Sequence, residues 1–175
     1  MAHADALPRR RRPFPERLKG ALMLDASVYE EVEHDPQALG QAALVVGLAA
    51  IAQALGSAGV GGFWGPMGAV VSGFLGWLLG TALVWLIGVK WLGHSSDYME
   101  LLRTLGFASA PKLLLVLTIV PILSALVWIG VLLLTLAAFV VAVRHALDVT
   151  TERAILVCLA AAGASILLSL LGIQV

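Results

Sequence analysis

Side chains that could ligate a divalent metal gather in one short stretch of the chain. Positions 30–35, EEVEHD, hold four carboxylic acids and one histidine, and further histidines follow at His94 and His145. Carboxylate and imidazole groups are common ligands of divalent cations. Acids are equally favoured near helix starts, where they meet the positive end of the helix dipole. We favour the second interpretation, a solvated amphipathic helix, and expect no metal and no other cofactor.

The usual signatures of catalysis are missing from the sequence. It contains no HExxH, GxSxG or GxxxxGK[ST] motif, which would indicate a metalloprotease, a serine hydrolase or a phosphate-binding loop. Its long apolar runs contain no acid, although proton relays and intramembrane aspartyl proteases need one. We therefore expect that the protein is not an enzyme.

One basic residue stands directly against an apolar run. In RTLGFASAPKLLLVLTIVPIL, Pro111 and Lys112 precede a long apolar segment. Proline lacks an amide hydrogen and interrupts a helix, while a charge inside a bilayer is costly. We expect the helix to break here and to lift Lys112 toward the cytoplasmic interface, where it meets a lipid phosphate or an acid such as Asp97, Glu100 or Asp148. A transport or ligand-binding role is the alternative.

Composition places the chain in a membrane. Of its 175 residues, 60% are hydrophobic and only 13% charged, and the mean hydropathy is +0.96. Soluble domains carry about 25% charged residues. The net charge of zero argues against a nucleic-acid partner, which favours a basic excess. Cys158 is the sole cysteine, so no intrachain disulfide can form.

The apolar runs predict five membrane-spanning helices. A span needs about 20 apolar residues. The segment between Arg103 and Arg144 would be about 60 Å long as one helix, twice the thickness of the hydrocarbon core. It must therefore fold back near Pro121. The predicted spans are 38–56, 66–88, 104–120, 123–144 and 151–173.

The distribution of charge predicts the orientation of these spans. With five spans, Lys90, Arg103, Arg144 and Arg153 all fall on the same side as the basic N-terminal segment. Basic residues accumulate on the cytoplasmic side of membrane proteins. We expect an all-α integral membrane protein with a cytoplasmic N-terminus, an exterior C-terminus and short amphipathic helices on the cytoplasmic side.

Three regions follow from this pattern. Residues 1–15 form a flexible tail rich in proline and arginine, residues 16–35 a cytoplasmic amphipathic segment, and residues 36–175 the membrane domain. The four arginines 9–12, together with Arg17 and Lys19, attract anionic lipids or act as a topology determinant. The bilayer is thus the first expected partner.

Helix start signals mark the cytoplasmic segments. Ser27 with Glu30 forms a capping-box pattern, and a second such pattern pairs Ser96 or Asp97 with Glu100. Asp35 followed by Pro36 predicts the N-cap and first residue of span one. The candidates for functional or interface roles are Asp25, Asp35, Pro36, Arg103, Pro111, Lys112, Arg144, Asp148 and Arg153.

Small residues recur at every fourth position of the second span. We call Gly68, Ser72, Gly76 and Gly80 the glycine stripe. Without side-chain bulk, two helix backbones can approach closely and gain dispersion contacts. We expect the stripe to face another helix, either within the chain or in a second copy in a homo-oligomer.

The sequence resembles the Yip1-domain family of small polytopic membrane proteins. The resemblance runs from about Gly20 to Gly172 and rests on the order of three segments: LDASVYEEVEHDPQALGQA, YMELLRTLGFASAP and AVRHALDVTTERAI. It implies five helices, a cytoplasmic N-terminus and an exterior C-terminus.

Eukaryotic members of that family are associated with the Golgi, the endoplasmic reticulum, vesicle traffic and Rab-type small GTPases. This chain has a shorter N-terminal tail and lacks the Asp-Leu-Tyr-Gly type of motif before the membrane, so we do not expect a Rab-type partner. It is similar to the compact prokaryotic members, which implies a prokaryotic inner membrane.

Two hypotheses for function follow. The first is a non-enzymatic membrane scaffold or adaptor whose cytoplasmic helices bind lipid or protein partners, including another membrane protein. The second is a small oligomeric channel or transporter that uses the proline-broken third span, since discontinuous helices are common at transport sites.

Overall fold

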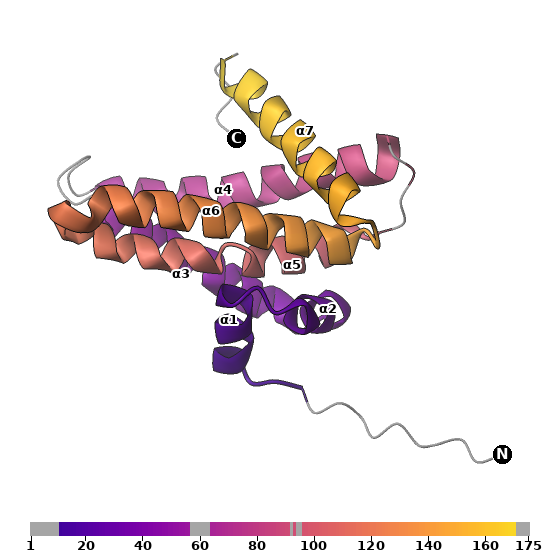
Figure 1. The fold of residues 1–175 in the computed structure, drawn as a ribbon, viewed down its shortest axis with the longest axis horizontal. Helices are drawn as coiled ribbons and strands as arrows, with labels where there is room; N and C mark the ends of the chain where they lie inside the picture. Colours follow the sequence, from indigo (N-terminus) through magenta and orange to yellow (C-terminus); the bar gives the residue numbers. More distant parts are fainter. Residues whose placement is uncertain (1–10, 57–63, 92, 94–95, 171–175) are drawn as a thin grey trace.

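The structure, a computed structural model, describes residues 11–56, 64–91, 93 and 96–170, which form helices and no strands (Figure 1). The α-helices are α1 (Phe14–Leu22), α2 (Ala26–His34), α3 (Ala38–Gly56), α4 (Trp64–Trp85), α5 (Tyr98–Phe107), α6 (Pro121–Ala146) and α7 (Thr151–Leu170). A π-helical turn, η1 (Leu86–Trp91), extends α4, and a 3₁₀-helix, η2 (Ala110–Ile119), follows α5.

Four segments of the described chain are long and apolar enough to cross a membrane. They are Ala38–Gly56, Met67–Lys90, Tyr98–Ile119 and Pro121–Ala146. The protein is therefore an all-helical integral membrane protein. The fifth predicted span corresponds to α7, which rises at a steep angle from the other long helices in Figure 1. The count of five and the orientation remain predictions.

The third span breaks at the predicted place but starts earlier than predicted. It begins at Tyr98 instead of residue 104, and Glu100 Oε2 accepts a hydrogen bond of 2.9 Å from the amide of Asp97, as the capping pattern predicted. The α-helix ends at Phe107, and after Ser109 the chain continues as η2. Because Pro111 cannot donate to the helical ladder, the span tightens into a 3₁₀-helix instead of ending.

The fold-back at Pro121 is confirmed. Pro121 is the first residue of α6, where its fixed φ suits a helix start, and α6 packs against η2. At its other end α6 stops at Ala146, and Asp148 adopts a φ of 50°, the left-handed conformation common after a helix. The turn leads directly into α7.

The N-terminal helices differ in detail from the predictions. Helix α1 begins at Phe14, inside the predicted tail, and residues 1–10 of that tail lie outside the described residues. The predicted cap at Ser27 is wrong, because Asp25 is the N-cap of α2 and accepts the amide of Ser27 at 3.0 Å. Asp35 Oδ1 accepts the amide of Gln37 at 3.1 Å, as the predicted cap would, but Pro36 is a turn residue and not the predicted first helical residue, because α3 begins at Ala38 and Asp35 is the C-cap of α2.

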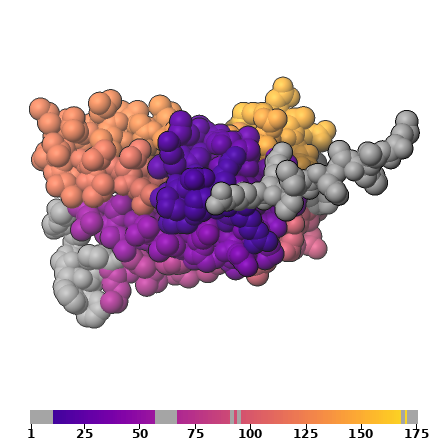
Figure 2. All heavy atoms as spheres, turned by 90° about the horizontal axis from the view of Figure 1, so that it is seen from below, coloured from indigo at the N-terminus to yellow at the C-terminus, as the bar shows by residue number. Residues whose placement is uncertain are grey.

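Helices α1 and α2 together form what we call the N-terminal cap. Figure 2 shows the cap, in indigo, lying across one flank of the helical bundle. Helix α2 contacts α5 and α6, and its buried face contributes Val28, Tyr29 and Val32 to the core. The helices behind the cap approach closely: a Cβ atom placed on Gly106 would lie 2.6 Å from the Cβ of Ala42. Small residues therefore bring α3 and α5 together.

The orientation can be tested with cysteines at two exposed turns and at the end of α7. In a Cys158→Ser background, Ile122→Cys and Leu170→Cys should react with a membrane-impermeant thiol reagent in intact cells. Asp148→Cys should react only after permeabilisation, because basic residues keep its side of the membrane cytoplasmic.

Each position tests a separate part of the prediction. Labelling of Asp148→Cys in intact cells would show that the orientation is wrong. Labelling of Leu170→Cys only after permeabilisation would show that α7 does not cross the membrane, and the protein would then have four spans.

Candidate functional site

A buried arginine holds the N-terminal cap together. Arg17 is 1% exposed, although it lies in a helix at the edge of the molecule. Its guanidinium Nη2 lies 2.8 Å from a carboxylate oxygen of Glu31 and 2.7 Å from one of Asp35. Its Nη1 donates to Gln41 Oε1 at 3.0 Å. We call Arg17, Glu31 and Asp35 the arginine cluster; it ties α1 to α2 and to the start of α3.

The arginine cluster shifts the ionisation of its members. Burial alone would lower the pKa of Arg17, but the hydrogen bonds to Asp35 and Glu31 outweigh it and the pKa is raised. Burial likewise opposes the charge on Asp35, but its hydrogen bond from Arg17 keeps its pKa below the ordinary value. Both groups therefore remain charged at neutral pH and stabilise each other.

Two further arginines surround this cluster at the surface. Arg11, whose side chain is 62% exposed, reaches Asp35 at 3.1 Å. The main-chain amide of Arg12 donates to Glu31 at 2.9 Å, and its side chain lies 3.4 Å from Asp25. Exposed pairs of this kind contribute about 0 to 1 kcal/mol each, so Arg17 is the energetic centre of the site.

A second arginine joins the cap to the membrane domain. Arg103 on α5 is 8% exposed, and its Nε donates to the main-chain carbonyls of Val32 at 3.1 Å and Glu33 at 3.0 Å. Its Nη2 also donates to the carbonyl of Glu33. These carbonyls belong to the last turn of α2, where the helix leaves acceptors without partners and carries partial negative charge. Arg103 therefore caps α2 from a different helix.

Glu33 lies in the contact between the cap and the bundle. Its side chain is buried, and its pKa is raised to about 7, mainly by burial. The charge of His34 lowers this pKa, whereas the nearby carboxylates of Asp148, Glu100 and Glu30 raise it further. His34 Nδ1 lies 2.9 Å from the carbonyl of Glu30, and this contact raises the pKa of the imidazole. The junction therefore changes charge near neutral pH.

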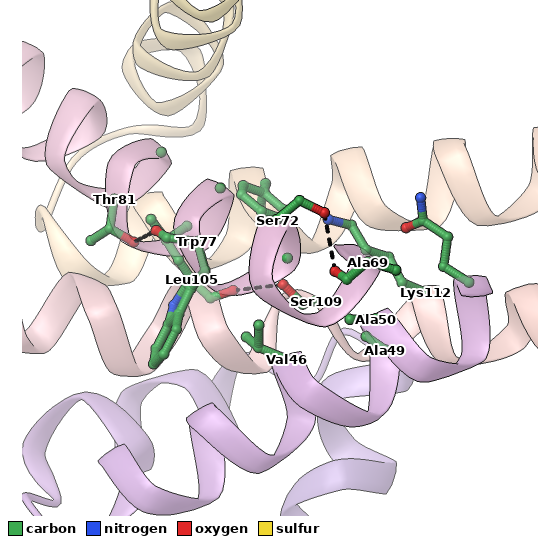
Figure 3. Close-up of a pocket in the computed structure, with 15 residues that line it drawn as sticks. Val46, Ala49, Ala50, Ala69, Ser72, Trp77, Thr81, Leu105, Ser109 and Lys112 are labelled. Carbon is green, nitrogen blue, oxygen red and sulfur yellow. Dashed lines mark hydrogen bonds between the residues drawn. The ribbon is translucent and has the colours of Figure 1, made fainter. Parts of the chain in front are cut away.

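The second polar feature is a cavity of about 370 Å³ within the membrane domain, shown in Figure 3. We call it the membrane cavity. It lies among α3, α4, the α5–η2 segment and α6. Its lining residues are Val46, Ala49, Ala50, Gln53, Ala69, Ser72, Gly73, Gly76, Trp77, Gly80, Thr81, Leu105, Ser109, Lys112 and Phe139.

Lys112 lines this cavity and does not form an ion pair with any of the acids that the sequence suggested. Its Nζ lies 5.9 Å from the ring centroid of Phe139, within the range of a cation–π contact. Among the described residues, no acid lies within ion-pair distance of Lys112. Pro111 is buried beside it. The break therefore directs Lys112 into a cavity rather than to an acid at the cytoplasmic interface.

Three members of the glycine stripe, Ser72, Gly76 and Gly80, line the same cavity. Within the described chain, a Cβ atom placed on Gly68, Gly76 or Gly80 would have no heavy atom within 4 Å beyond its own helix. The expected contact with a neighbouring helix of the same chain is thus not formed at these positions. Packing against a second subunit remains a prediction.

The remaining candidates from the sequence are exposed residues that neither line the membrane cavity nor belong to the arginine cluster. Arg144 is exposed in the last turn of α6, Asp148 is exposed in the turn that follows, and Arg153 is exposed in the first turn of α7. Pro36 is an exposed turn residue between α2 and α3. Within the part of the chain that the structure describes, no three histidine, cysteine or acidic side chains are placed to hold a metal; His94 lies outside it.

Sequence reasoning missed the role of Arg17. We assigned it with the neighbouring basic residues to lipid attraction or to membrane topology, yet its side chain forms ion pairs with Glu31 and Asp35. The sequence contained one signal of a binding partner for a buried arginine. Glu31 and Asp35 lie four positions apart, about one helical turn, and so share a face of the chain.

Comparison with known protein families gives a match that covers most of the chain. The family model of the Yip1 domain matches residues 20–173, which include the last turn of α1 and all of the later helices. No curated protein and no solved structure matches the chain.

The arginine cluster makes a quantitative prediction about stability. Arg17→Met should lower the free energy of unfolding by about 3 kcal/mol, because the buried carboxylate of Asp35 and the partly buried one of Glu31 lose the buried cation that lies closest to them. The matched control Arg11→Met should cost about 1 kcal/mol or less, since that side chain is exposed. Denaturant titration in mild detergent measures both, and equal effects of the two changes would contradict the central role of Arg17.

The raised pKa of Glu33 predicts that the stability of the protein depends on pH. Its folded-state pKa of about 7 exceeds its ordinary value of 4.5, so its contribution to stability is complete below pH 4.5 and is lost as the pH rises through 7. Glu33→Gln should therefore stabilise the protein at pH 8 relative to wild type, by about 1 to 3 kcal/mol, and not at pH 4.5. Melting curves of both proteins across this range measure the difference, and parallel curves would refute the assignment.

Proposed function

Because the chain is an integral membrane protein that belongs to the Yip1 family, we propose that it acts as a non-enzymatic scaffold or adaptor in a prokaryotic inner membrane. In this proposal the N-terminal cap is the platform for a partner, and the membrane domain anchors it. The observation that carries the proposal is the double attachment of the cap by Arg17 and Arg103.

A cap that is held in one position is well suited to binding a partner. Ordering of loops and side chains on binding costs free energy, and a surface that is already held in place avoids that cost. The arginine cluster fixes α1 on α2, and Arg103 fixes α2 on the bundle. The outer face of α1 therefore keeps one position relative to the membrane domain.

The outer face of the cap supports a protein partner better than a lipid one. Arg12, Glu16, Lys19, Met23 and Asp25 border a surface groove of about 420 Å³. The groove carries charges of both signs, whereas anionic lipids are attracted by surfaces that are basic throughout. Met23 is 70% exposed, and a flexible apolar side chain of this kind adapts to a partner.

A small oligomeric channel or transporter remains the second candidate. The membrane cavity beside the break at Pro111 favours it, because transport sites are often built from discontinuous helices within the membrane. The two candidates differ in what accompanies the protein in the membrane.

Affinity capture from native membranes distinguishes the candidates. After crosslinking and extraction in mild detergent, a scaffold should recover a second protein in stoichiometric amount. Combined substitution of Lys19→Ala and Met23→Ala should remove that protein, whereas Glu152→Ala, at an exposed position on α7, should retain it. Recovery of a homo-oligomer alone would refute the adaptor proposal and favour transport.

A further inference from the structure

The membrane cavity contains an isolated positive charge. Of its described lining residues, Lys112 alone carries a charged group and none is acidic. The 3₁₀-helix rises about 2 Å per residue, so Lys112 lies about 16 Å from Val120, where the chain turns, near the middle of the hydrocarbon core. Charges at this depth are costly and mark binding or transport sites. The contact with Phe139 compensates only part of that cost.

The other hydroxyl and indole donors of the lining are already engaged. Each donates to a main-chain carbonyl, so none of them has its hydrogen available for a ligand. These bonds run from Ser72 to Ala69 (3.1 Å), Trp77 to Leu102 (3.0 Å), Thr81 to Trp77 (2.7 Å) and Ser109 to Leu105 (3.3 Å). The lining therefore offers a ligand one charged group, the ammonium of Lys112, and beside it the carboxamide of Gln53 and mainly small or apolar walls.

These features define the chemistry of a ligand. One cation balances one negative charge, and glycine and alanine walls leave room for an apolar body. Ser72, at the border of the cavity, is exposed, which gives the cavity an opening on the surface of α4. We propose that the membrane cavity binds an amphiphilic monocarboxylate, such as a fatty acid, with its carboxylate on Lys112.

The number of donors argues for a carboxylate over a phosphate. A phosphate group carries up to two charges and three acceptor oxygens, and it would bury charge that one ammonium group cannot compensate. A carboxylate needs fewer donors. The same carboxylate chemistry could also come from a short soluble acid, and chain length separates these two sources experimentally.

The experiment uses the full-length protein in non-ionic detergent and palmitate that carries a photoreactive diazirine. Irradiation should attach the probe to peptides of α3 and α4. Unlabelled palmitate should compete, whereas acetate, inorganic phosphate and phosphatidic acid should not. Competition by acetate or inorganic phosphate would overturn the amphiphile in favour of a soluble anion, and competition by phosphatidic acid would overturn the preference for a carboxylate.

Variants test the proposed contact. Lys112→Met should weaken competition by palmitate at least about tenfold, the effect of losing one charge-assisted hydrogen bond, and Lys112→Arg should largely restore it. Lys90→Met is the matched control, because Lys90 also lies over an aromatic ring, 5.3 Å from the centroid of Trp85, but does not line the cavity. It should bind like wild type.

Gly76→Leu tests the cavity without a change of charge. A leucine here has open space to enter, so the protein should fold with little change in melting temperature while palmitate labelling of α3 and α4 is lost. This variant keeps the test decisive if Lys112→Met fails to fold. Unchanged labelling in Gly76→Leu, or in a folded Lys112→Met, would overturn the proposal.

Discussion

The hydrogen bonds from Arg103 to the last turn of α2 couple the two parts of the protein. Arg103 lies on α5, and the segment that continues α5 beyond Phe107 carries Lys112 into the membrane cavity. One end of this segment therefore fixes the N-terminal cap, and the other forms a wall of the cavity. Buried carbonyls at a helix end need partners, so this contact also determines where α2 can lie.

The elements that the sequence predicted correctly depend on local or one-dimensional signals. Apolar length gave the first four spans to within six residues at each end, and Pro121 marked the start of α6 because proline suits a helix start and not a helix interior. The cap at Asp97 follows from the spacing to Glu100. Such signals act within a few residues and do not require knowledge of the packing.

The sites were harder to predict because they depend on contacts between distant residues. Arg103 donates to carbonyls 70 and 71 positions away, and a main-chain acceptor leaves no trace in the sequence. Arg17 lies among other arginines, and only the fold of α1 onto α2 separates it from its exposed neighbours. The glycine stripe shows the same difficulty: the pattern predicted close packing against another helix, and within the described chain the structure has open space at Gly76.

Proline and glycine together account for the cavity. Pro111 removes a helical hydrogen bond, and the tighter 3₁₀ turn that follows changes the direction of side chains relative to a continuous α-helix. Gly76 and Gly80 on α4 provide no side chain to fill the space opposite. An apolar core would normally close such a space, since voids lose dispersion contacts. Lys112 explains why it can persist, because a buried ammonium group is stabilised by a space large enough for water or an anion.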